Sequence, residues 1–433
     1  MAQRAGQRLL DFMRHLYSAL LYLLTPVILL RLVYRGFRAR DYWRRWPQRL
    51  GFLPALPKQP SIWLHAVSVG EFQAALPLLR ALQRIYPGVP LVVTTTTPTG
   101  LQRALATFGS TGVICAHVPY DLPDAVARFL ARARPRVAII METELWPNLY
   151  RGCAQRNIPV LVVNARLSEK SARGYRRIGG LVRQTLSDVT CIAAQTDDDA
   201  ERFEALGADP SRVRVLGNVK YDMHVPDDLP LRAAALRAQW DEARPVWIAG
   251  STHAGEDAIV LDAFDRVRAV LPNTLLIIVP RHPERFSEVA TLCVRRGLRV
   301  CRRSDANADW PACKVYVGDT MGDLLLLYAA SDAAFVGGSL VAVGGHNMLE
   351  PAAVAVPVAM GPYTFNFRDV AGRMLAAGAA QEVRTADDLA RVMLQWLQST
   401  EARVLVGQHG QHVVAANRGA VQRVLALIAE SMK

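Results

Sequence analysis

The feature that most constrains the fold is an alternation of short β-branched runs with helical stretches, which occurs twice along the chain. Helical segments such as 72–86 and 173–186 separate the first set of candidate strands. That set comprises 62–67, 91–96, 113–118, 136–141, 159–163, 189–194 and 212–216. The alternation restarts after residues 222–231, with candidate strands at 245–249, 274–279, 297–301, 314–317, 332–336 and 357–360. This pattern predicts parallel sheets with helices on both faces.

A chain of 433 residues has room for two domains at about 100–200 residues each. We predict an α/β protein with two Rossmann-like, doubly wound domains and a cleft between them. The N-terminal domain is placed at 47–222, a linker at 223–231 and the C-terminal domain at 232–433. Ligands of doubly wound sheets bind beyond the carboxyl ends of the strands, so polar residues at those ends form the candidate site.

The preceding segment, residues 1–46, is basic and contains an apolar run. The net charge is +13, and ten arginines and two aspartates place +8 of it in the first 50 residues. The rest of the chain carries a small excess for its length, so no nucleic-acid partner is expected. Leu16–Leu30 is uncharged and apolar, and the run resumes after Arg31 as far as Tyr34. We predict a helix at about 16–34 that attaches the protein to an anionic membrane surface.

Three arrangements of this helix stay open: an anchor that crosses the bilayer, a helix that lies in the membrane surface, and a buried helix of a soluble protein. The uncharged run is shorter than the roughly 20 residues that span a bilayer. Pro26 is tolerated in a membrane helix but is unfavourable in the middle of a soluble one. The heavier positive charge after the run predicts that the body of the protein stays in the cytoplasm.

The cysteines indicate neither a disulfide framework nor a metal site. Six are present, without a CxxC pair and without metal-ligand spacing. In a long chain with a large core they indicate buried thiols in a reducing compartment. They are Cys115, Cys153, Cys191, Cys293, Cys301 and Cys313.

Charged residues follow several candidate strands of the N-terminal domain. Glu71 comes directly after Ser68-Val69-Gly70, at the expected start of a helix. A carboxylate there either favours the helix dipole or takes a proton from an attacking hydroxyl. Glu142 and Glu144 end the strand at 136–141, and on an extended segment they would share one side. Lys220, which follows the last strand of this domain, is one of five lysines and a candidate positioned cation.

Four turns at strand ends of the C-terminal domain suggest a nucleotide site. Small or glycine-containing turns allow a ligand to approach the backbone closely, and helix N-termini bind phosphate. The glycine-containing turns are 250–253, 318–323, 337–339 and 344–351, and a further turn at 280–285 is fixed by two prolines. Ser251 and Thr252 belong to a turn that could cradle a phosphate, Arg281 could clamp a phosphate, and Glu350 could accept the hydroxyls of a ribose.

Taken together, these segments resemble the Kdo (3-deoxy-D-manno-octulosonic acid) transferases of lipopolysaccharide synthesis. The resemblance covers nearly the whole chain, including the apolar N-terminus. Met348 and Asp323 depart from the family, which often has Pro and Glu at these positions. The matching motifs are SVGE at 68–71, TTTTPTG at 94–100, ETELWPNL at 142–149, NARLS at 164–168, GNVKYD at 217–222, GSTHAGED at 250–257, PRHPERF at 280–286, GDTMGDL at 318–324 and GGHNMLEP at 344–351.

The resemblance implies a glycosyltransferase of the B-type fold that transfers Kdo with inversion and without a metal or other cofactor. The donor would be CMP-Kdo, bound mainly by the C-terminal domain. The resemblance assigns the CMP site to Arg281, His282, Met321, Gly322, Asp323, Asn347, Met348, Leu349 and Glu350. The acceptor would be a lipid A precursor at the cytoplasmic face of the inner membrane. Glu71 matches the catalytic base of the family, and Glu142 and Lys220 match additional charged residues at the reacting centre. Whether Glu142 or Glu144 is the second important carboxylate stays open.

Two alternatives are retained. A nucleotide-sugar 2-epimerase-like enzyme has the same two-domain architecture but does not need a membrane helix. A membrane-tethered nucleotide-binding module without catalysis would keep the glycine turns but would be expected to lose the carboxylates at 71 and 142, and this chain has both.

Overall fold

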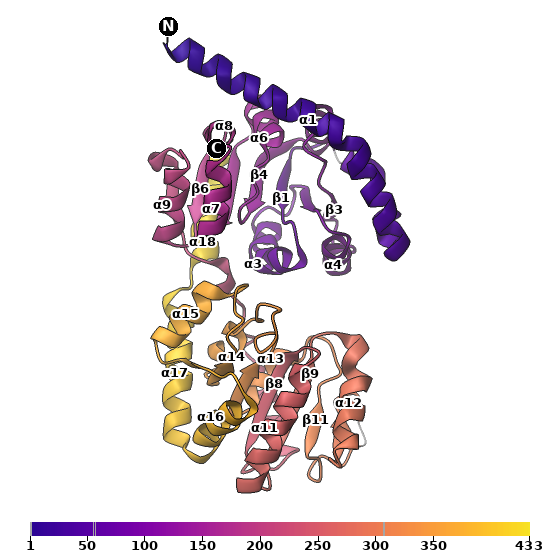
Figure 1. Ribbon diagram of the computed structural model, residues 1–433, viewed down its shortest axis with the longest axis vertical. Helices are drawn as coiled ribbons and strands as arrows, with labels where there is room; N and C mark the ends of the chain where they lie inside the picture. Colours follow the sequence, from indigo (N-terminus) through magenta and orange to yellow (C-terminus); the bar gives the residue numbers. More distant parts are fainter. Residues whose placement is uncertain (1, 55, 57, 306–307) are drawn as a thin grey trace. The chain divides into compact units, whose positions relative to one another are not determined.

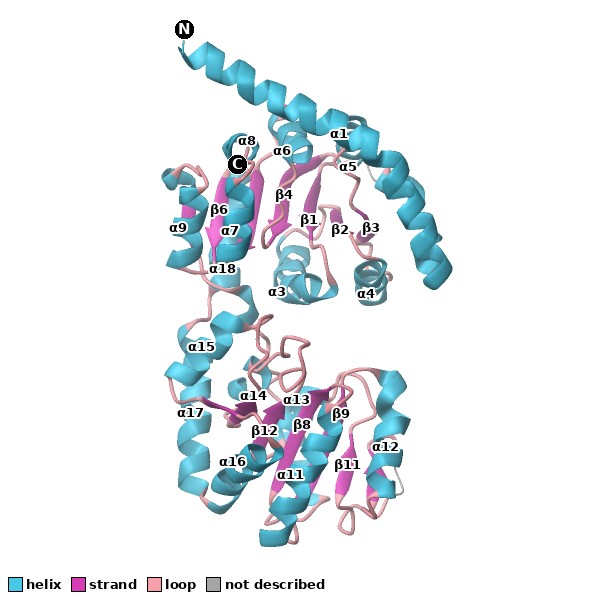
Figure 2. Ribbon diagram, in the orientation of Figure 1, coloured by secondary structure: helices cyan, strands magenta, loops and turns pink. Residues whose placement is uncertain are grey.

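The computed structural model describes residues 2–54, 56, 58–305 and 308–433. By contacts between residues the chain divides into two compact units. Unit 1 is Met1–Asp222 together with Arg418–Lys433, and unit 2 is Met223–Asn417. Figure 2 shows that each unit contains its own sheet with helices packed around it. This confirms the predicted α/β class with two Rossmann-like domains.

Unit 1 is built on a parallel sheet of seven strands in the order β3-β2-β1-β4-β5-β6-β7. The strands are β1 (Ser61–His65), β2 (Leu91–Thr95), β3 (Ile114–His117), β4 (Pro135–Met141), β5 (Val160–Ala165), β6 (Cys191–Ala194) and β7 (Val213–Val215). The helices around it are α3 (Val69–Ile85), α4 (Pro98–Phe108), α5 (Pro123–Ala133), α6 (Pro147–Ala154), α7 (Glu169–Arg176), α8 (Gly179–Ser187) and α9 (Asp197–Ala205). The predicted helical stretch at 173–186 is therefore interrupted, between Arg176 and Gly179.

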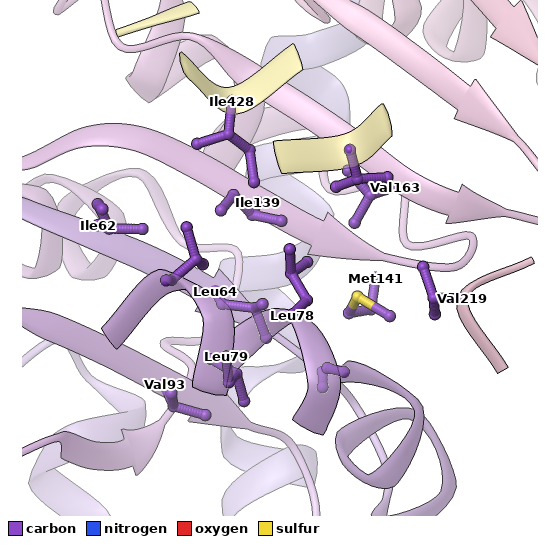
Figure 3. Packing of buried hydrophobic residues seen from close by; sticks show 14 of the residues in the cluster. Ile62, Leu64, Leu78, Leu79, Val93, Ile139, Met141, Val163, Val219 and Ile428 are labelled. Carbon is purple, nitrogen blue, oxygen red and sulfur yellow. The ribbon is translucent and has the colours of Figure 1, made fainter. Parts of the chain in front are cut away.

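Helices pack on both faces of this sheet, because the side chains that its strands direct to each face are apolar. Ile62 and Leu64 of β1 pack on the face that carries α3, whereas Trp63 packs on the face that carries α5. Buried parallel strands of this kind are expected to be apolar throughout rather than alternating with polar residues. Figure 3 shows the first of these faces, with Ile139 of β4 close to Leu78 and Ile428.

Unit 2 repeats the architecture, with strand order β10-β11-β9-β8-β12-β13-β14. The strands are β8 (Val246–Thr252), β9 (Leu275–Pro280), β10 (Val300–Arg302), β11 (Val315–Val317), β12 (Ala333–Val336), β13 (Val358–Met360) and β14 (Ala380–Glu382). Its helices are α10 (Leu229–Ala238), α11 (Glu256–Val270), α12 (Phe286–Arg295), α13 (Leu324–Ala329), α14 (Leu349–Ala353), α15 (Arg368–Ala376), α16 (Ala386–Gln398) and α17 (Thr400–Ala416). All pairings between its strands are parallel.

The end of the chain corrects the predicted domain boundary. Residues 232–433 were expected to form one domain, but helix α18 (Ala420–Ser431) belongs to unit 1. The Asp222 carboxylate accepts backbone N–H bonds from Gly419 and Val421, at 2.5 and 2.6 Å. A carboxylate at a helix N-terminus satisfies its free N–H groups and favours the helix dipole. The other boundary, after Asp222, agrees with the prediction.

A substitution of Ile428 tests how much α18 contributes to the stability of unit 1. Its side chain is fully buried in the core shown in Figure 3. Ile428→Ala should lower the free energy of unfolding of unit 1 by about 2–5 kcal/mol, because it leaves a cavity in a packed core. Chemical denaturation followed by tryptophan fluorescence measures the change. Gln422→Ala, at an exposed position of the same helix, is the control and should change stability little; equal effects of both variants would refute the packing assignment.

The N-terminal helix α1 (Ala2–Arg38) is longer than the predicted 16–34. Among the described residues, α1 is the one helix that is long and apolar enough, over Phe12–Phe37, to cross a membrane. That statement rests on length and composition alone. Figure 1 shows α1 running along unit 1 with a bend, and the helix contains Pro26. A short 3-10 helix, η1 (Arg40–Trp43), and helix α2 (Trp46–Arg49) lead from it to β1.

Candidate active site

Glu71 lies in the first turn of α3, beyond the carboxyl end of β1. One carboxylate oxygen, Oε2, accepts the backbone N–H of Val67 at 2.7 Å, and Oε1 lies 3.2 Å from the hydroxyl of Ser68. The Ser68 hydroxyl in turn accepts the N–H of Glu71. These hydrogen bonds hold the carboxylate at the N-terminus of α3, where the side chains of Ser68 and Glu71 satisfy free backbone N–H groups. The predicted place of Glu71 at a strand end is therefore what the structure shows.

Burial, followed by the negative charge of Glu142 and then that of Glu144, raises the pKa of Glu71 to about 7. Glu142 follows β4 (Pro135–Met141) directly. Strand β4 is the neighbour of β1 in the sheet, so the ends of these strands bring the two carboxylates together. A carboxyl group with a pKa near neutrality is suited to general base catalysis.

Glu142 faces Lys220, with 3.7 Å between Oε1 and Nζ. Lys220 is part of a short 3-10 helix, η3 (Val219–Tyr221), that follows β7. Its backbone N–H is bound by the Asn218 side chain. The side chains of Lys220 and Glu142 are both partly buried, which strengthens their attraction relative to an exposed pair. The three predicted charged residues of unit 1 thus all follow strands of one sheet, and two of them, Glu142 and Lys220, form an ion pair.

The prediction that Glu142 and Glu144 share one side of an extended segment is wrong. Glu142 has φ +57°, in the left-handed region, which turns the chain at the end of β4. Glu142 therefore pairs with Lys220, whereas Glu144 accepts a hydrogen bond from Trp146 Nε1 at 2.9 Å. Burial, followed by the charge of Glu142, raises the pKa of Glu144 to about 7.

Asn164, at the end of β5, supports this arrangement. It also has a left-handed backbone, with φ +54°, and it is fully buried. Its side-chain oxygen accepts the N–H of Val219 at 3.1 Å, one residue before Lys220. The sequence identified Asn164 only as part of a motif. The neighbouring strands β4 and β5 thus both end at residues with a left-handed backbone, Glu142 and Asn164. Such backbone conformations in residues other than glycine are concentrated at functional sites.

In unit 2, Ser251 and Thr252 end the central strand β8. Ser251 has φ +59°, and the Thr252 hydroxyl donates to Asp257 at 2.7 Å. Both side chains are largely buried. Asp257 also pairs with Arg285, so the Thr252 hydroxyl is part of a network of polar contacts that supports the turn.

Glu256, next to this turn, was not predicted. Its fully buried carboxylate accepts four backbone N–H groups at 2.7–3.0 Å, from His253, Gly338, Ser339 and Leu340. Hydrogen bonds to a carboxylate are stronger than those between neutral groups. Glu256 therefore joins the turn after β8 to the glycine turn after β12. In sequence it resembles any glutamate in the first turn of a helix, which is why it was missed.

Two histidines stack beside the same glycine turn. The Nε2 atoms of His253 and His346 are 2.7 Å apart, and their rings are nearly parallel. Burial lowers the pKa of both and brings that of His346 to about 3. Neutral rings can share one proton, with one nitrogen donating and the other accepting. His282, which was predicted, packs edge-on against His253 and is exposed at the surface.

Five further predicted residues of unit 2 lie in the turns at 280–285 and 344–351. Arg281 lies close enough to Glu350 to oppose the rise in the Glu350 pKa that burial causes, and Asn347 donates to Glu350 at 3.0 Å. Asn347 Oδ1 also accepts the N–H of Leu349. These three polar residues come from two turns and form one cluster. The side chains of Met348 and Leu349 are fully buried in the core, which leaves only their backbone available to a ligand.

The last three predicted residues of unit 2, Met321, Gly322 and Asp323, lie in the turn at 318–323. Met321 is exposed, and Gly322 has φ +96°, which favours glycine. Asp323 is bound by Thr320 at 2.7 Å and Arg303 at 3.2 Å. Across the described ranges, no group of three or more His, Cys, Asp or Glu side chains has the arrangement of a metal site.

Comparison with known proteins agrees with this geometry. The family model described as 3-deoxy-D-manno-octulosonic-acid transferase (kdotransferase) matches residues 44–223. A 3-deoxy-D-manno-octulosonic acid transferase of Haemophilus influenzae is 42% identical over 96% of this chain and 98% of its own length. One from Bordetella pertussis is 38% identical over 95% of this chain and 98% of its own length.

Among solved structures, a putative UDP-N-acetylglucosamine 2-epimerase from Listeria monocytogenes is 16% identical, with a TM-score of 0.56. The match covers 86% of this chain and 96% of the epimerase. At this identity the likeness shows the two-domain α/β fold alone. The long, full-length matches above carry the assignment: the chain belongs to the 3-deoxy-D-manno-octulosonic acid transferase family of glycosyltransferases.

Proposed function

We propose that the protein transfers Kdo from CMP-Kdo to a hydroxyl group of a lipid A precursor, at the cytoplasmic face of the inner membrane. The observation that carries the proposal is the Glu71 carboxylate, which is held at a strand end with a pKa raised to about 7 beside the Glu142–Lys220 pair. A 2-epimerase or a binding module would not need a base placed for an acceptor hydroxyl. The strong likeness to named transferases supports the same conclusion.

In the proposed reaction, the Glu71 carboxylate takes the proton of the acceptor hydroxyl. The hydroxyl oxygen then forms a bond to the anomeric carbon of Kdo, while the bond from that carbon to the CMP phosphate breaks. Attack opposite the leaving group inverts the configuration, through an oxocarbenium-like transition state. Burial and the negative charge of Glu142 raise the Glu71 pKa, so the proton is held well once transferred.

The nucleotide is proposed to bind at the carboxyl edge of the unit 2 sheet, where Arg281, Asn347 and Glu350 cluster. The Arg281 guanidinium neutralises the phosphate, which becomes a better leaving group when its charge is bound. The Glu350 carboxylate is placed to accept sugar hydroxyls of the nucleotide. In this proposal the arginine supplies the positive charge, and no divalent cation is required.

A direct assay tests the proposal. CMP-Kdo is first made from CTP and Kdo by a CMP-Kdo synthetase, and the synthetase is removed by filtration. The purified protein is then incubated with this donor and a lipid A precursor in excess EDTA, and the lipid is analysed by mass spectrometry. A mass gain of one or more Kdo units is expected. Unchanged lipid, or conversion of UDP-N-acetylglucosamine to its 2-epimer in a parallel incubation, would reject the transferase assignment.

The pH dependence of turnover should report the Glu71 carboxyl group. Because the base must be ionised, kcat/KM should rise with pH, with a midpoint near the raised pKa of about 7, and then level off. Glu142→Gln removes a negative charge near Glu71 and should move this midpoint to lower pH. Burial is the larger cause of the raised pKa, so the midpoint should stay above the usual glutamate value. Profiles of kcat/KM between about pH 5 and 9 measure both midpoints; an upward shift would contradict the assignment of Glu71.

A further inference from the structure

Helix α1 carries a continuous exposed apolar stripe. Eight large apolar side chains recur every three or four residues, and each is between 48% and 74% exposed. At about 100° per residue they fall within one arc of about 100°, along roughly seven turns of the helix. They are Phe12, Leu16, Leu20, Leu23, Val27, Leu30, Tyr34 and Phe37. An apolar surface of this length on a soluble helix calls for a partner.

The opposite face of α1 is bound to unit 1 by side-chain hydrogen bonds. Tyr17 donates to Asp121 at 3.1 Å, and Tyr22 donates to Asp124 at 2.7 Å. Ser18 donates to the side chain of Asn148, at 3.0 Å. On the helical wheel these three residues lie away from the apolar stripe.

Asp121 is the central acceptor of this contact. It is almost fully buried and also accepts the backbone N–H groups of Asn148 and Leu149, at 3.0 and 2.7 Å. It therefore ties α1 to the N-terminus of α6, which is part of the folded α/β unit. Further along α1, Leu32 is buried and the Trp43 indole donates to the backbone carbonyl of Val33 at 2.9 Å.

These contacts conflict with a helix that crosses the bilayer over Phe12–Phe37. That segment is 26 residues long, about 39 Å as a helix, so a hydrocarbon core of about 30 Å would enclose the region around Tyr17–Tyr22. The carboxylates of Asp121 and Asp124 would then have to enter the hydrocarbon with unit 1 or lose their partners. Both outcomes are costly, because charged groups inside a bilayer are strongly disfavoured.

The charges around the stripe indicate what it binds. Arg31 and Arg35 are exposed and flank its second half, and Arg40, Arg44 and Arg45 follow the helix directly. Basic side chains beside an apolar face fit an anionic lipid surface, whereas a repeat of charges suited to a coiled coil is lacking at these positions. The stripe is also continuous with an apolar cavity of about 280 Å³ in unit 1, which Leu16 and Leu20 line together with Tyr175 and Leu181.

From these observations we infer that α1 lies in the plane of an anionic membrane surface, with the stripe of eight residues in the lipid and its opposite face still bound to unit 1. The inference rests on the proposed membrane site of the transferase and specifies how the protein is attached there. Both ends of α1 then lie on the cytoplasmic side of the membrane.

Protease access in cells tests the arrangement. A peptide tag is fused before Met1 of the full chain, and a second is placed after Lys433. Both tags should resist protease added to spheroplasts, and both should be cleaved in inverted membrane vesicles. Cleavage of the N-terminal tag in spheroplasts would show that α1 crosses the membrane and would overturn the inference.

Binding to vesicles tests the stripe itself. The double variant Leu23→Glu, Leu30→Glu should reduce flotation with vesicles of phosphatidylglycerol and phosphatidylethanolamine by at least about tenfold, since each buried leucine contributes strongly. The control is Leu231→Glu, Val294→Glu, which changes two exposed apolar residues of unit 2 and should float like the original protein. Equal flotation of the two variants, or a dimer that Leu23→Glu dissociates in the absence of lipid binding, would contradict the inference.

A third measurement separates this inference from the proposed function. With acceptor lipid dispersed in detergent, the Leu23→Glu, Leu30→Glu variant should still transfer Kdo, because the stripe lies outside the proposed catalytic residues. Transfer by the original protein together with a periplasmic N-terminal tag would reject the in-plane helix and leave the transferase intact. Absence of transfer by the original protein would reject the function, whatever the position of the tag.

Discussion

Glu71→Gln should lower kcat by about 10²–10⁴-fold, the usual contribution of a general base, while the Kd for CMP stays unchanged. Glutamine keeps the shape of the side chain and can still accept the N–H of Val67, but it cannot take a proton from the acceptor. The proposed nucleotide residues belong to unit 2, so their affinity for CMP should not depend on this change. Single-turnover Kdo transfer and isothermal titration with CMP measure the two quantities.

Stability separates a chemical effect of Glu71→Gln from unfolding. Folding raises the Glu71 pKa from its usual value to about 7, so the stability that this group contributes is present at acid pH and is lost as pH rises through 7. Above pH 7 the neutral glutamine should therefore fold at least as well as the original residue. Glu169→Gln, another glutamate in the first turn of a helix, is the matched control and should retain full turnover. Retention of substantial activity by Glu71→Gln would remove it from the role of base.

Glu256→Gln should weaken CMP binding by about 10–100-fold, because hydrogen bonds to a charged acceptor contribute about 1.5–3 kcal/mol each and 1.4 kcal/mol is tenfold in affinity. Glutamine presents one oxygen and an NH₂ group where Glu256 now accepts four N–H groups. The mismatch should loosen the turns after β8 and β12 together.

Two measurements together distinguish a loosened nucleotide site from an unfolded unit 2. Thermal unfolding of Glu256→Gln is followed alongside titration with CMP, and Glu242→Gln, at an exposed position of unit 2, is the control for both. The expected result is a folded protein with a raised Kd for CMP and an unchanged pH midpoint of turnover. An unchanged Kd would show that the Glu256 bonds do not position the nucleotide turns.

Much of the fold could be predicted because its signals are local. Strands such as 136–141 are short apolar runs between helices, and the structure has β4 at nearly these residues. The strand β14 was missed because Ala380-Gln381-Glu382 has low strand propensity and only three residues. The place of α18 in unit 1 depends on Asp222, almost 200 residues earlier in the chain, and no local pattern carries such a contact.

The candidate site was predictable to the extent that it sits at strand ends. Glu71, Glu142 and Lys220 were found because parallel strands place their carboxyl ends at one edge. The pairing of Glu142 with Lys220, rather than with Glu144, follows from a left-handed backbone at a residue that is not glycine. Sequence patterns rarely signal such a conformation. Glu256 has no signal of its own, since its role depends on backbone groups of a turn more than 80 residues away.

The placement of α18 also bears on the order in which the protein is made. A ribosome synthesises the strands of unit 1 first, then all of unit 2, and only afterwards the residues Val421, Val424 and Ile428 that complete the first core. Until release, the nascent chain exposes the part of the unit 1 core that α18 covers, although α1, α3 and α4 have long since emerged. A chain whose first core is completed last depends on chaperones to keep that apolar surface from aggregating in the interval.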